Sequence, residues 1–453
     1  MTLRIEPASL SPARPRRLDV AVVGSGVSGL SAAWLLSQAH NVTLYEAEPR
    51  LGGHAHTRDA AGLAVDTGFI VYNTPTYPNL TALFEHLGVG TQATDMSFAV
   101  SLDGGRLEYS GANLPGLFAQ RRNLVRPRHW AMLRDLLRFY REAPRDAESF
   151  EGSLADYLDA NGYSLAFRED HLYPMAAAIW STPAGEVGRY PFTAFTRFCA
   201  NHGLLKLTGR PIWRTVRGGS REYVKRLHGA MRGEAVTRTP VVAVRRDARG
   251  VEVIDGDGHH RRFDEVVLAC HADQALRLIE VPTARERDVL GAFSYSVNET
   301  VLHSDPRLMP VRRRAWAAWN YLAQQERPGA LSVTYWMNKL QNLPGSTPLF
   351  VTLNPLTEPH PETIHYTQSY RHPVFDGRAM AAQKRLWSLQ GEGGVWFCGA
   401  YFGAGFHEDG LQAGLAVAEA LGGVRRPWNV AQESGRIHVG PAPFRQFGGG
   451  VAA

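Results

Sequence analysis

Cysteine is scarce in this chain, and a segment that would direct it out of the cell is missing. The three cysteines among 453 residues, Cys199, Cys270 and Cys398, lie far apart. They form neither a disulfide framework nor paired metal-ligand spacing, which favours a reducing compartment. The first 17 residues lack the apolar stretch of a secretory signal. We therefore expect a cytoplasmic protein in which residues 1–17 form a disordered tail.

Motifs of several other protein classes are also missing. A di-iron site needs several carboxylates and E-x-x-H pairs on helices, and only Glu362 and His365 show that spacing. His259 and His260 fall in a predicted hairpin turn, so we expect no metal site. No G-x-S-x-G nucleophile motif occurs. The net charge of +6 favours anionic partners, but no nucleic-acid recognition fold accompanies it, and we expect no nucleic-acid binding.

Residues 20–48, VAVVGSGVSGLSAAWLLSQAHNVTLYEAE, have the length of a membrane span but fit a nucleotide-binding unit better. Gly24, Gly26 and Gly29 form G-x-G-x-x-G between an apolar strand and an Ala/Leu-rich helix, and a second strand ends at Glu46. Gly24 permits a tight turn, Gly26 lets the backbone approach a pyrophosphate, and Gly29 lets the helix pack on the strand.

The same unit supplies further candidate contacts to a dinucleotide. Val27 and Ser28 open the helix, whose free amides and partial positive charge attract phosphates. Glu46 can accept hydrogen bonds from a ribose, with Ala47 beside it. The motif occurs once, so we expect one dinucleotide site.

The next segment, EPRLGGHAHT, separates FAD from NAD. It contains Arg50, Gly52, Gly53 and Thr57. The chain here resembles the amine oxidase and phytoene desaturase superfamily of flavoproteins, in which R-x-G-G-(Arg/Lys)-x-x-(Ser/Thr) follows the ribose-binding acid. His54 stands where that motif has Arg or Lys. The resemblance implies FAD as cofactor and a Rossmann-like α/β FAD-binding domain of the GR2 type, with an inserted α+β substrate-binding domain.

Three later segments agree with this resemblance and in the superfamily lie near FAD. LAVDTGFIVYN contains Gly68 and VVAVRRDARGVEVIDGDG contains Val242. GVWFCGAYFGAGFHEDGLQAGLAVAEAL resembles the superfamily's closing motif, where Gly399 ends a strand. In this motif Asp409, Gly410 and Leu411 open a helix facing the flavin.

A closer resemblance covers residues 18–428. Phrases such as PIWRTVRGGSREYV and VTYWMNKLQNL resemble a bacterial group of FAD-binding proteins that includes the flavin-dependent desaturase of furan fatty acid synthesis. The resemblance implies a methylated, unsaturated fatty acyl or phospholipid substrate, hydride transfer to flavin N5 and formation of a conjugated diene. The electrons would leave to oxygen or a quinone.

Two other functions stay open. An amine oxidase would want aromatic residues at the flavin, and Trp396, Tyr401 and Phe402 are candidates. A non-catalytic flavoprotein would hold FAD as a structural group. Catalytic residues are not identifiable from sequence, and the candidates are those near flavin motifs: Tyr72, His54, His407 and Glu408.

The resemblance also divides the chain. Asp66 is either functional or pins a turn, and Ser220 in RGGS either closes over the cofactor or caps a helix. We expect an FAD-binding domain from 18–75, 216–275 and 391–428, a substrate-binding domain from 76–215 and 276–390, and a C-terminal tail from 429–453.

Residues 117–141 combine seven arginines, from Arg121 to Arg141, with leucines and aromatics. Such a basic, aromatic helix can lie on an anionic membrane surface. It can equally be a domain helix with a solvated arginine face. Peripheral attachment to the inner face of the cell membrane therefore stays open, as does a homo-oligomer.

Overall fold

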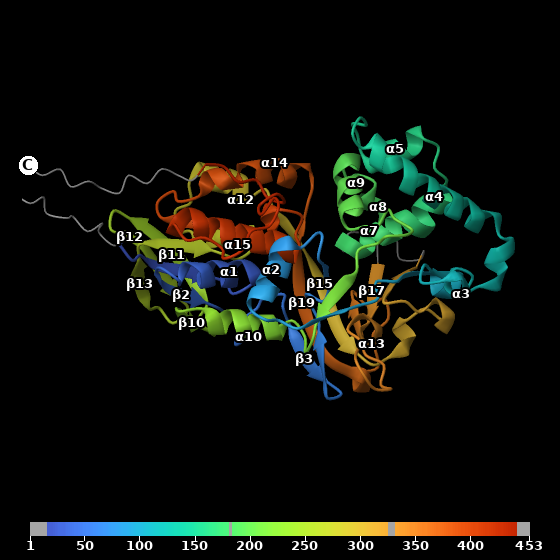
Figure 1. The fold of residues 1–453 in the computed structure, drawn as a ribbon, viewed down its shortest axis with the longest axis horizontal. Coiled ribbons are helices and arrows are strands. Elements are labelled where there is room, and N and C mark those ends of the chain that lie inside the picture. The colour runs from blue at the N-terminus through green and yellow to red at the C-terminus, as the bar shows by residue number, and fades with distance from the viewer. Residues whose placement is uncertain (1–15, 181–183, 325–330, 442–453) are drawn as a thin grey trace, which may run out of the picture.

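The computed structural model describes residues 16–180, 184–324 and 331–441. Two bodies of structure lie side by side (Figure 1). One is built around a parallel sheet with α1 and α15, and the other carries the helices α3 to α9. The buried apolar side chains form two corresponding clusters, here called the first and the second core.

The first core surrounds a five-stranded parallel sheet in the order β10-β2-β1-β14-β20. Residues 20–23 are buried on both faces, as expected for a parallel strand with an unbroken apolar sequence. The strands are β1 (Asp19–Val23), β2 (Asn41–Tyr45), β10 (Glu234–Val236), β14 (Glu265–Leu268) and β20 (Val395–Phe397).

Helix α1 (Val27–Leu36) is buried along its whole length. It packs against α15 (His407–Gly422), α10 (Arg221–Ala230) and the sheet. A helix that is apolar all round is buried in a core or a membrane, and the packing shows that this one is a core helix. No helix of the described ranges is long and apolar enough to cross a membrane.

The predicted series of strands and turns after residue 240 is present. The strands β11 (Val241–Asp247), β12 (Gly250–Asp255) and β13 (His260–Phe263) form an antiparallel sheet, and the chain then returns to the parallel sheet at β14.

A seven-stranded sheet runs beside the second core in the order β19-β15-β18-β17-β16-β7-β8. Its β7 pairs in parallel with β16, which joins segments more than 200 residues apart. The strands are β7 (Phe98–Leu102), β8 (Leu107–Ser110), β15 (Ser294–His303), β16 (Trp319–Ala323), β17 (Leu331–Trp336), β18 (Phe350–Leu353) and β19 (Ile364–Val374).

The helices of the second body pack on this sheet or on one another. They are α3 (Leu114–Leu117), α4 (Pro127–Asp146), α5 (Leu154–Ala160), α6 (Leu165–Phe167), α7 (Tyr173–Trp180), α8 (Ala184–Val187), α9 (Phe192–Asn201) and α13 (Met337–Leu340). Helix α2 (Pro78–His86) packs on α15 in the first core. Two smaller sheets are formed by β3 (Thr57–Ala60) with β4 (Leu63–Asp66), and by β5 (Tyr72–Asn73), β9 (Trp213–Val216) and β6 (Thr91–Ala93).

The structure redraws two predicted boundaries. Helices α12 (Ala284–Leu290) and α14 (Gly377–Leu386) fall in the predicted substrate domain but pack into the first core after α11 (Ala272–Leu278). Their buried alanines and leucines cover the parallel sheet, not the seven-stranded one.

The predicted C-terminal tail also packs in part on the first core. Arg436 pairs with Asp409 on α15 at 2.6 Å, and Ile437 is buried. Residues 1–15 and 442–453 of the two predicted tails lie outside the described residues.

Candidate functional site

One large cavity runs from the parallel sheet to the helices of the second body. Its volume is about 1610 Å³, and both bodies contribute to its wall. Sites for a single small ligand measure roughly 300–1,000 Å³. The cavity therefore has room for a dinucleotide and a second molecule.

The sheet end of the cavity is a backbone cradle. Gly24 has a φ of +100°, and a Cβ there would lie 2.9 Å from the carbonyl oxygen of Ala269. Helix α1 begins after Gly26, which supplies no side-chain cap. Gly26, Val27 and Ser28 line the cavity, so the free amides of the first helical turn lie in its wall.

Glu46 lies beside this cradle and is held in place. Its Oε2 accepts from the backbone N–H of Ser25 at 2.9 Å and from the Ser25 hydroxyl, and its Oε1 accepts from the N–H of Glu48 at 2.9 Å. A second glycine loop closes over the cradle, because a Cβ on Gly53 would lie 3.0 Å from the Cα of Gly26. The two loops form a narrow, glycine-walled slot suited to a pyrophosphate.

Histidines gather in the middle of the cavity wall. The ring of His54 lies 6.3 Å from that of His271, 5.5 Å from that of His372 and 5.0 Å from that of Tyr370. His407 stacks on Phe69 with ring centroids 3.7 Å apart.

These imidazoles are neutral. Burial lowers the pKa of His271 and of His372 to about 4 and that of His407 to about 3. Burial, reinforced by the neighbouring histidines and Arg50, holds the pKa of His54 well below its ordinary value. Neutral imidazoles can accept a proton, but they bring no charge to a phosphate.

A chain of hydrogen bonds fixes the tautomer of His372. The backbone N–H of Glu299 donates to Asn354 Oδ1 at 3.0 Å, Asn354 Nδ2 donates to Asn298 Oδ1 at 2.9 Å, and Asn298 Nδ2 donates to His372 Nδ1 at 3.0 Å. His372 therefore carries its proton on Nε2 and is a donor. Within this histidine group, His54 Nε2 and His271 Nδ1 are buried with no partner in the part of the chain that the structure describes.

Comparison with known proteins places the chain in a family. The model of the flavin containing amine oxidoreductases matches residues 27–422. The chain belongs to this family, and its cofactor is FAD.

Relatives of known sequence match only in part. A 15-cis-phytoene desaturase of Narcissus pseudonarcissus is 34% identical over 131 residues, which is 28% of this chain and 22% of that protein. The flavin-containing amine oxidase A of Equus caballus is 40% identical over 81 residues, 17% of this chain and 15% of that protein. The chain thus matches about a fifth of the length of its curated relatives.

Solved structures share the fold over nearly the whole chain. Cyclohexylamine oxidase from Brevibacterium oxydans has a TM-score of 0.60 at 16% identity, over 90% of this chain and 99% of that one. A CLA-producing fatty acid isomerase from P. acnes has a TM-score of 0.61 at 16% identity, over 89% of this chain and 98% of that one. The predicted fold class, a Rossmann-like FAD-binding domain with a substrate domain, is confirmed.

The cradle fits FAD. Of the residues predicted to bind the cofactor, those lining the cavity are Gly24, Gly26, Val27, Ser28, Glu46, Ala47, Gly53, His54, Gly68 and Gly399. A Cβ on Gly68 would lie 2.2 Å from the carbonyl oxygen of His54, so only glycine fits in this wall. The neutral ring of His54 cannot supply the cation that the family motif has at this position.

Other predicted cofactor residues support the cradle from behind. A Cβ on Gly29 would lie 1.8 Å from the Gly24 carbonyl oxygen, which matches its predicted packing role, and Gly52 has a φ of +116°. Thr57 donates to Asp66 at 2.6 Å, away from the cavity. Arg50 does not line the cavity, and its Nη1 is buried without a partner in the part of the chain that the structure describes.

The segment predicted to bring a backbone contact near Val242 to the adenine does line the cavity, although Val242 itself does not. Val242 is exposed, and the residues of that segment in the cavity wall are Thr239, Pro240 and Val241. An irregularity in strand pairing at this point turns Val242 outward.

Asp409, Gly410 and Leu411 also lie outside the wall, because α15 begins two residues earlier, at His407. Gly410 instead packs closely on α1, where its Cβ would lie 2.8 Å from Ser28 Oγ.

Two catalytic candidates are likewise corrected. Tyr72 is buried between Tyr77 and Phe84 and does not reach the cavity. Glu408 is buried and accepts from the backbone N–H groups of Asn79 and Leu80, so it anchors α2 to α15. His54 and His407 remain in the wall.

Asp66 joins three segments. It accepts hydrogen bonds from Thr57 Oγ1 at 2.6 Å, from the N–H and hydroxyl of Ser220, and from Gln341 Nε2 at 2.8 Å. Burial raises its pKa to about 6, against the effect of these donors. Asp66 therefore holds these three segments together. Ser220 takes part in the same hydrogen bonds, and its side chain does not cap helix α10.

The far end of the cavity is apolar and was not located by sequence. Helices α4 and α7 and the segment 203–212 line it, and no sequence motif marks them. Its wall includes Leu117, Trp130, Leu133, Leu136, Leu137, Tyr140, Met175, Ile179, Leu204, Leu207 and Ile212.

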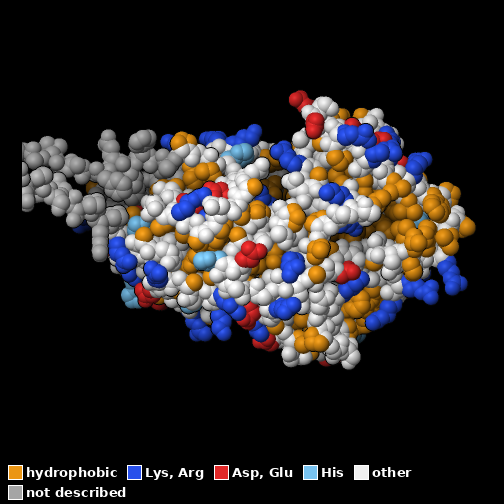
Figure 2. All heavy atoms as spheres, in the orientation of Figure 1, with side chains coloured by type: hydrophobic (Ala, Val, Ile, Leu, Met, Phe, Trp, Pro, Cys, Tyr) orange, Lys and Arg blue, Asp and Glu red, His pale blue; other side chains and the backbone are white. Residues whose placement is uncertain are grey.

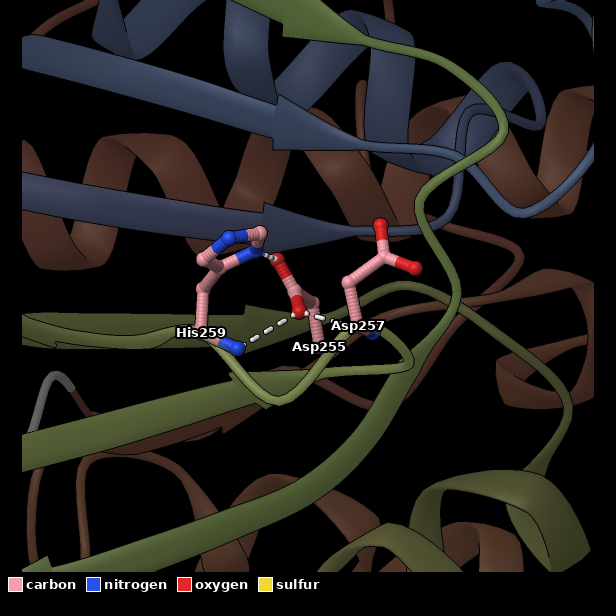
Figure 3. A group of neighbouring side chains, drawn as sticks. All are labelled: Asp255, Asp257 and His259. Atoms are coloured by element: carbon pink, nitrogen blue, oxygen red, sulfur yellow. Dashed lines mark hydrogen bonds and ion pairs between the residues drawn. The ribbon is translucent and has the colours of Figure 1, made fainter.

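A group of potential metal ligands lies elsewhere. Among the described residues only Asp255, Asp257 and His259 bring such atoms together (Figure 3). Asp255 Oδ1 accepts from the backbone N–H groups of Asp257 and His259 at 3.0 and 2.9 Å, and its Oδ2 lies 3.1 Å from His259 Nδ1. These bonds shape the turn between β12 and β13. Glu362 and His365 are not part of the group, and His365 Nε2 lies 2.6 Å from Ser304 Oγ.

Proposed function

We propose that this oxidoreductase desaturates a methylated, unsaturated fatty acyl chain, as in furan fatty acid synthesis. The observation that carries the proposal is the composition of the cavity beyond the cradle. This apolar limb is lined mostly by leucines and aromatics, and its charged residues include Arg134 and Arg210. An acyl chain with an anionic head group suits such a wall.

The same wall disfavours an amine. The carboxylates in the cavity wall are Glu46 and Glu48 at the cradle and Asp95, which pairs with Lys339 at 3.4 Å. Because Asp95 is already paired, an ammonium group in the apolar limb would be desolvated without a carboxylate of its own, at a cost of several kcal/mol.

The positions of the aromatic residues expected for an amine oxidase site also argue against an amine substrate. Trp396 is buried and donates to Glu265 at 2.7 Å, and Phe402 is buried outside the wall. Only Tyr401 of the three lines the cavity.

Within this proposal the protein positions the chain, excludes water and takes up a proton. When bound, FAD supplies the two-electron oxidation by accepting a hydride at N5. Loss of this hydride from an allylic carbon and of a proton from the neighbouring carbon leaves a conjugated diene. The proton passes to a neutral imidazole, and the unpartnered nitrogens of His54 and His271 are the acceptors. Oxygen or a quinone then takes the two electrons.

An anaerobic test separates the candidates. The FAD-loaded protein is mixed with a methylated, monounsaturated phospholipid, with polyamines or with aromatic amines, and the loss of visible flavin absorbance is followed. Bleaching by the lipid, with a diene found by mass spectrometry, is expected. Bleaching by an amine alone would favour an amine oxidase, and bleaching by none of them a non-catalytic flavoprotein.

A variant pair tests the proton acceptor. His271→Asn should slow bleaching by the lipid by about a hundredfold or more, with FAD content unchanged. The control His365→Asn changes an exposed histidine on β19 and should bleach at the wild-type rate. Equal rates in all three proteins would remove His271 from the reaction.

A further inference from the structure

The apolar limb of the cavity opens at the protein surface. Trp130, Leu137, Leu207 and Ile212 line the cavity and yet are each at least 50% exposed. Side chains that line a cavity and are also exposed to solvent mark the place where the cavity opens at the surface. This mouth lies between α4 and the segment 203–212.

Exposed apolar side chains continue around the mouth. Leu114, Leu124 and Val125 of α3 and the following turn (Arg121–Val125) are exposed, and Trp130 Nε1 donates to the carbonyl oxygen of Leu124 at 2.9 Å. Figure 2 shows hydrophobic side chains gathered at the end of the molecule that carries α3 and α4, with Lys and Arg around them. An exposed apolar area of this kind marks an interaction surface. We call these seven residues the mouth face.

The charge around the mouth face is mostly positive. Residues 111–141 contain seven arginines and one acid, Asp135, and residues 201–212 add one arginine and one lysine. Arg128 and Arg134 are paired with carboxylates. Within the described ranges, Arg121, Arg122 and Arg126 have no carboxylate within 4.0 Å. Desolvation and the neighbouring arginines 126, 312 and 106 lower the pKa of Arg122. The face is thus both apolar and positively charged.

We propose that the mouth face docks on an anionic phospholipid bilayer. Apolar side chains enter the interface while arginines beside them meet lipid phosphates, which is how a peripheral protein holds a membrane. A second copy of the chain fits this face poorly, because the two sets of cations would repel. Docking also brings the mouth to the lipid, so an acyl chain enters the cavity without crossing water. That last step rests on the proposed function, whereas docking does not.

Vesicle co-sedimentation of the FAD-loaded protein tests the docking. Vesicles contain phosphatidylcholine alone or mixed with an equal part of phosphatidylglycerol, and no turnover is required. We expect binding to the mixed vesicles, weak binding to phosphatidylcholine, and weaker binding at high salt. Failure to bind the mixed vesicles at low salt would overturn the proposal. Because binding and flavin bleaching are measured separately, docking and desaturation can fail independently.

Variants tie the binding to this face. Arg121→Gln with Arg122→Gln should weaken binding by about twenty-fivefold, since each basic residue near an anionic bilayer contributes about fivefold. Val125→Glu replaces a side chain that is 81% exposed and outside the cavity wall, and should also weaken binding. The matched control, Val281→Glu, replaces a side chain that is 77% exposed in the other body and should bind as the wild type does.

Two results would contradict the assignment of the face. One is equal loss of binding in Val125→Glu and Val281→Glu. The other is a wild-type dimer, seen by light scattering, that Val125→Glu converts to a monomer, because the face would then be an interface between copies. Flavin absorbance of each variant checks that it is folded.

Discussion

At the scale of single residues, Asp66 makes a sharp prediction. Asp66→Asn leaves one acceptor oxygen for the donors of Thr57, Ser220 and Gln341, and a buried unpaired donor costs about 1–3 kcal/mol. We expect the free energy of unfolding to fall by about 3 kcal/mol, measured by denaturant titration. The control Asp59→Asn breaks an exposed pair with Arg221 and should cost under about 1 kcal/mol. An equal fall in the free energy of unfolding in both variants would mean that Asp66 does not hold the three segments together.

The role of a residue could be predicted from sequence where it depends on backbone geometry, but not where it depends on the direction of the side chain. The tight approach at Gly24 and Gly29 needs glycine whatever the rest of the fold does. Glu408 is next to His407 in sequence, but helical geometry turns it toward α2 and away from the cavity. His271 and His372 meet His54 only through folding of segments more than 200 residues away, so no local pattern marks them.

At the scale of elements, the contact between α1 and α15 is tight enough to test. A Cβ on Gly414 would lie 2.2 Å from the carbonyl oxygen of Ser28 and 2.4 Å from Ser31 Oγ. Because one of these is backbone, Gly414→Ala must push the helices apart and should cost about 1–3 kcal/mol. The first turn of α1 belongs to the cradle, so we also expect weaker retention of FAD, measured by flavin absorbance after gel filtration.

A helical glycine with free space is the matched control. Gly229→Ala on α10 meets nothing within 4 Å, and it should leave FAD retention unchanged and raise stability by up to about 1 kcal/mol. Equal FAD loss in both variants would contradict the packing argument.

Strands and helices that follow from the local sequence pattern could be predicted, but the elements that they pair with could not. The strands and turns of residues 241–268 follow from β-branched runs broken by Asp and Gly. The parallel pairing of β7 with β16 depends on which edges remain free after both segments have folded. The basic segment 117–141 was open between a helix on a membrane surface and a domain helix with a solvated arginine face. In α4, Met132 and Phe139 are buried, while Trp130 and Leu137 are exposed.

At the scale of the whole molecule, the division into two bodies followed from the family resemblance, but the shared cavity did not. Its volume arises where the parallel sheet, β19 and α4 meet, and that meeting is set by packing between the two cores. The same packing buries histidines, because closing a cavity between two cores removes water from every polar group in the wall. The stability of the molecule should therefore depend on pH.

The expected dependence is a loss of stability as the pH falls below about 6.5. Burial lowers the pKa to about 4 in five histidines: His171, His202, His271, His303 and His372. In the unfolded chain these groups take up protons near pH 6.5, so acid favours unfolding until the folded protein is protonated near pH 4. Asp66 and Glu408 act in the opposite direction, because burial raises the pKa of Asp66 to about 6 and also raises that of Glu408, but two carboxyls oppose a larger number of imidazoles. Each unit of pKa difference corresponds to about 1.4 kcal/mol, so each of these histidines costs about 2 kcal/mol between pH 7 and pH 4.5, and we expect denaturant titrations to give up to about 10 kcal/mol less stability at pH 4.5 than at pH 7. A flat profile would mean that the pKa values of these histidines are not lowered in the folded protein, and a rise in stability toward acid would mean that they are raised.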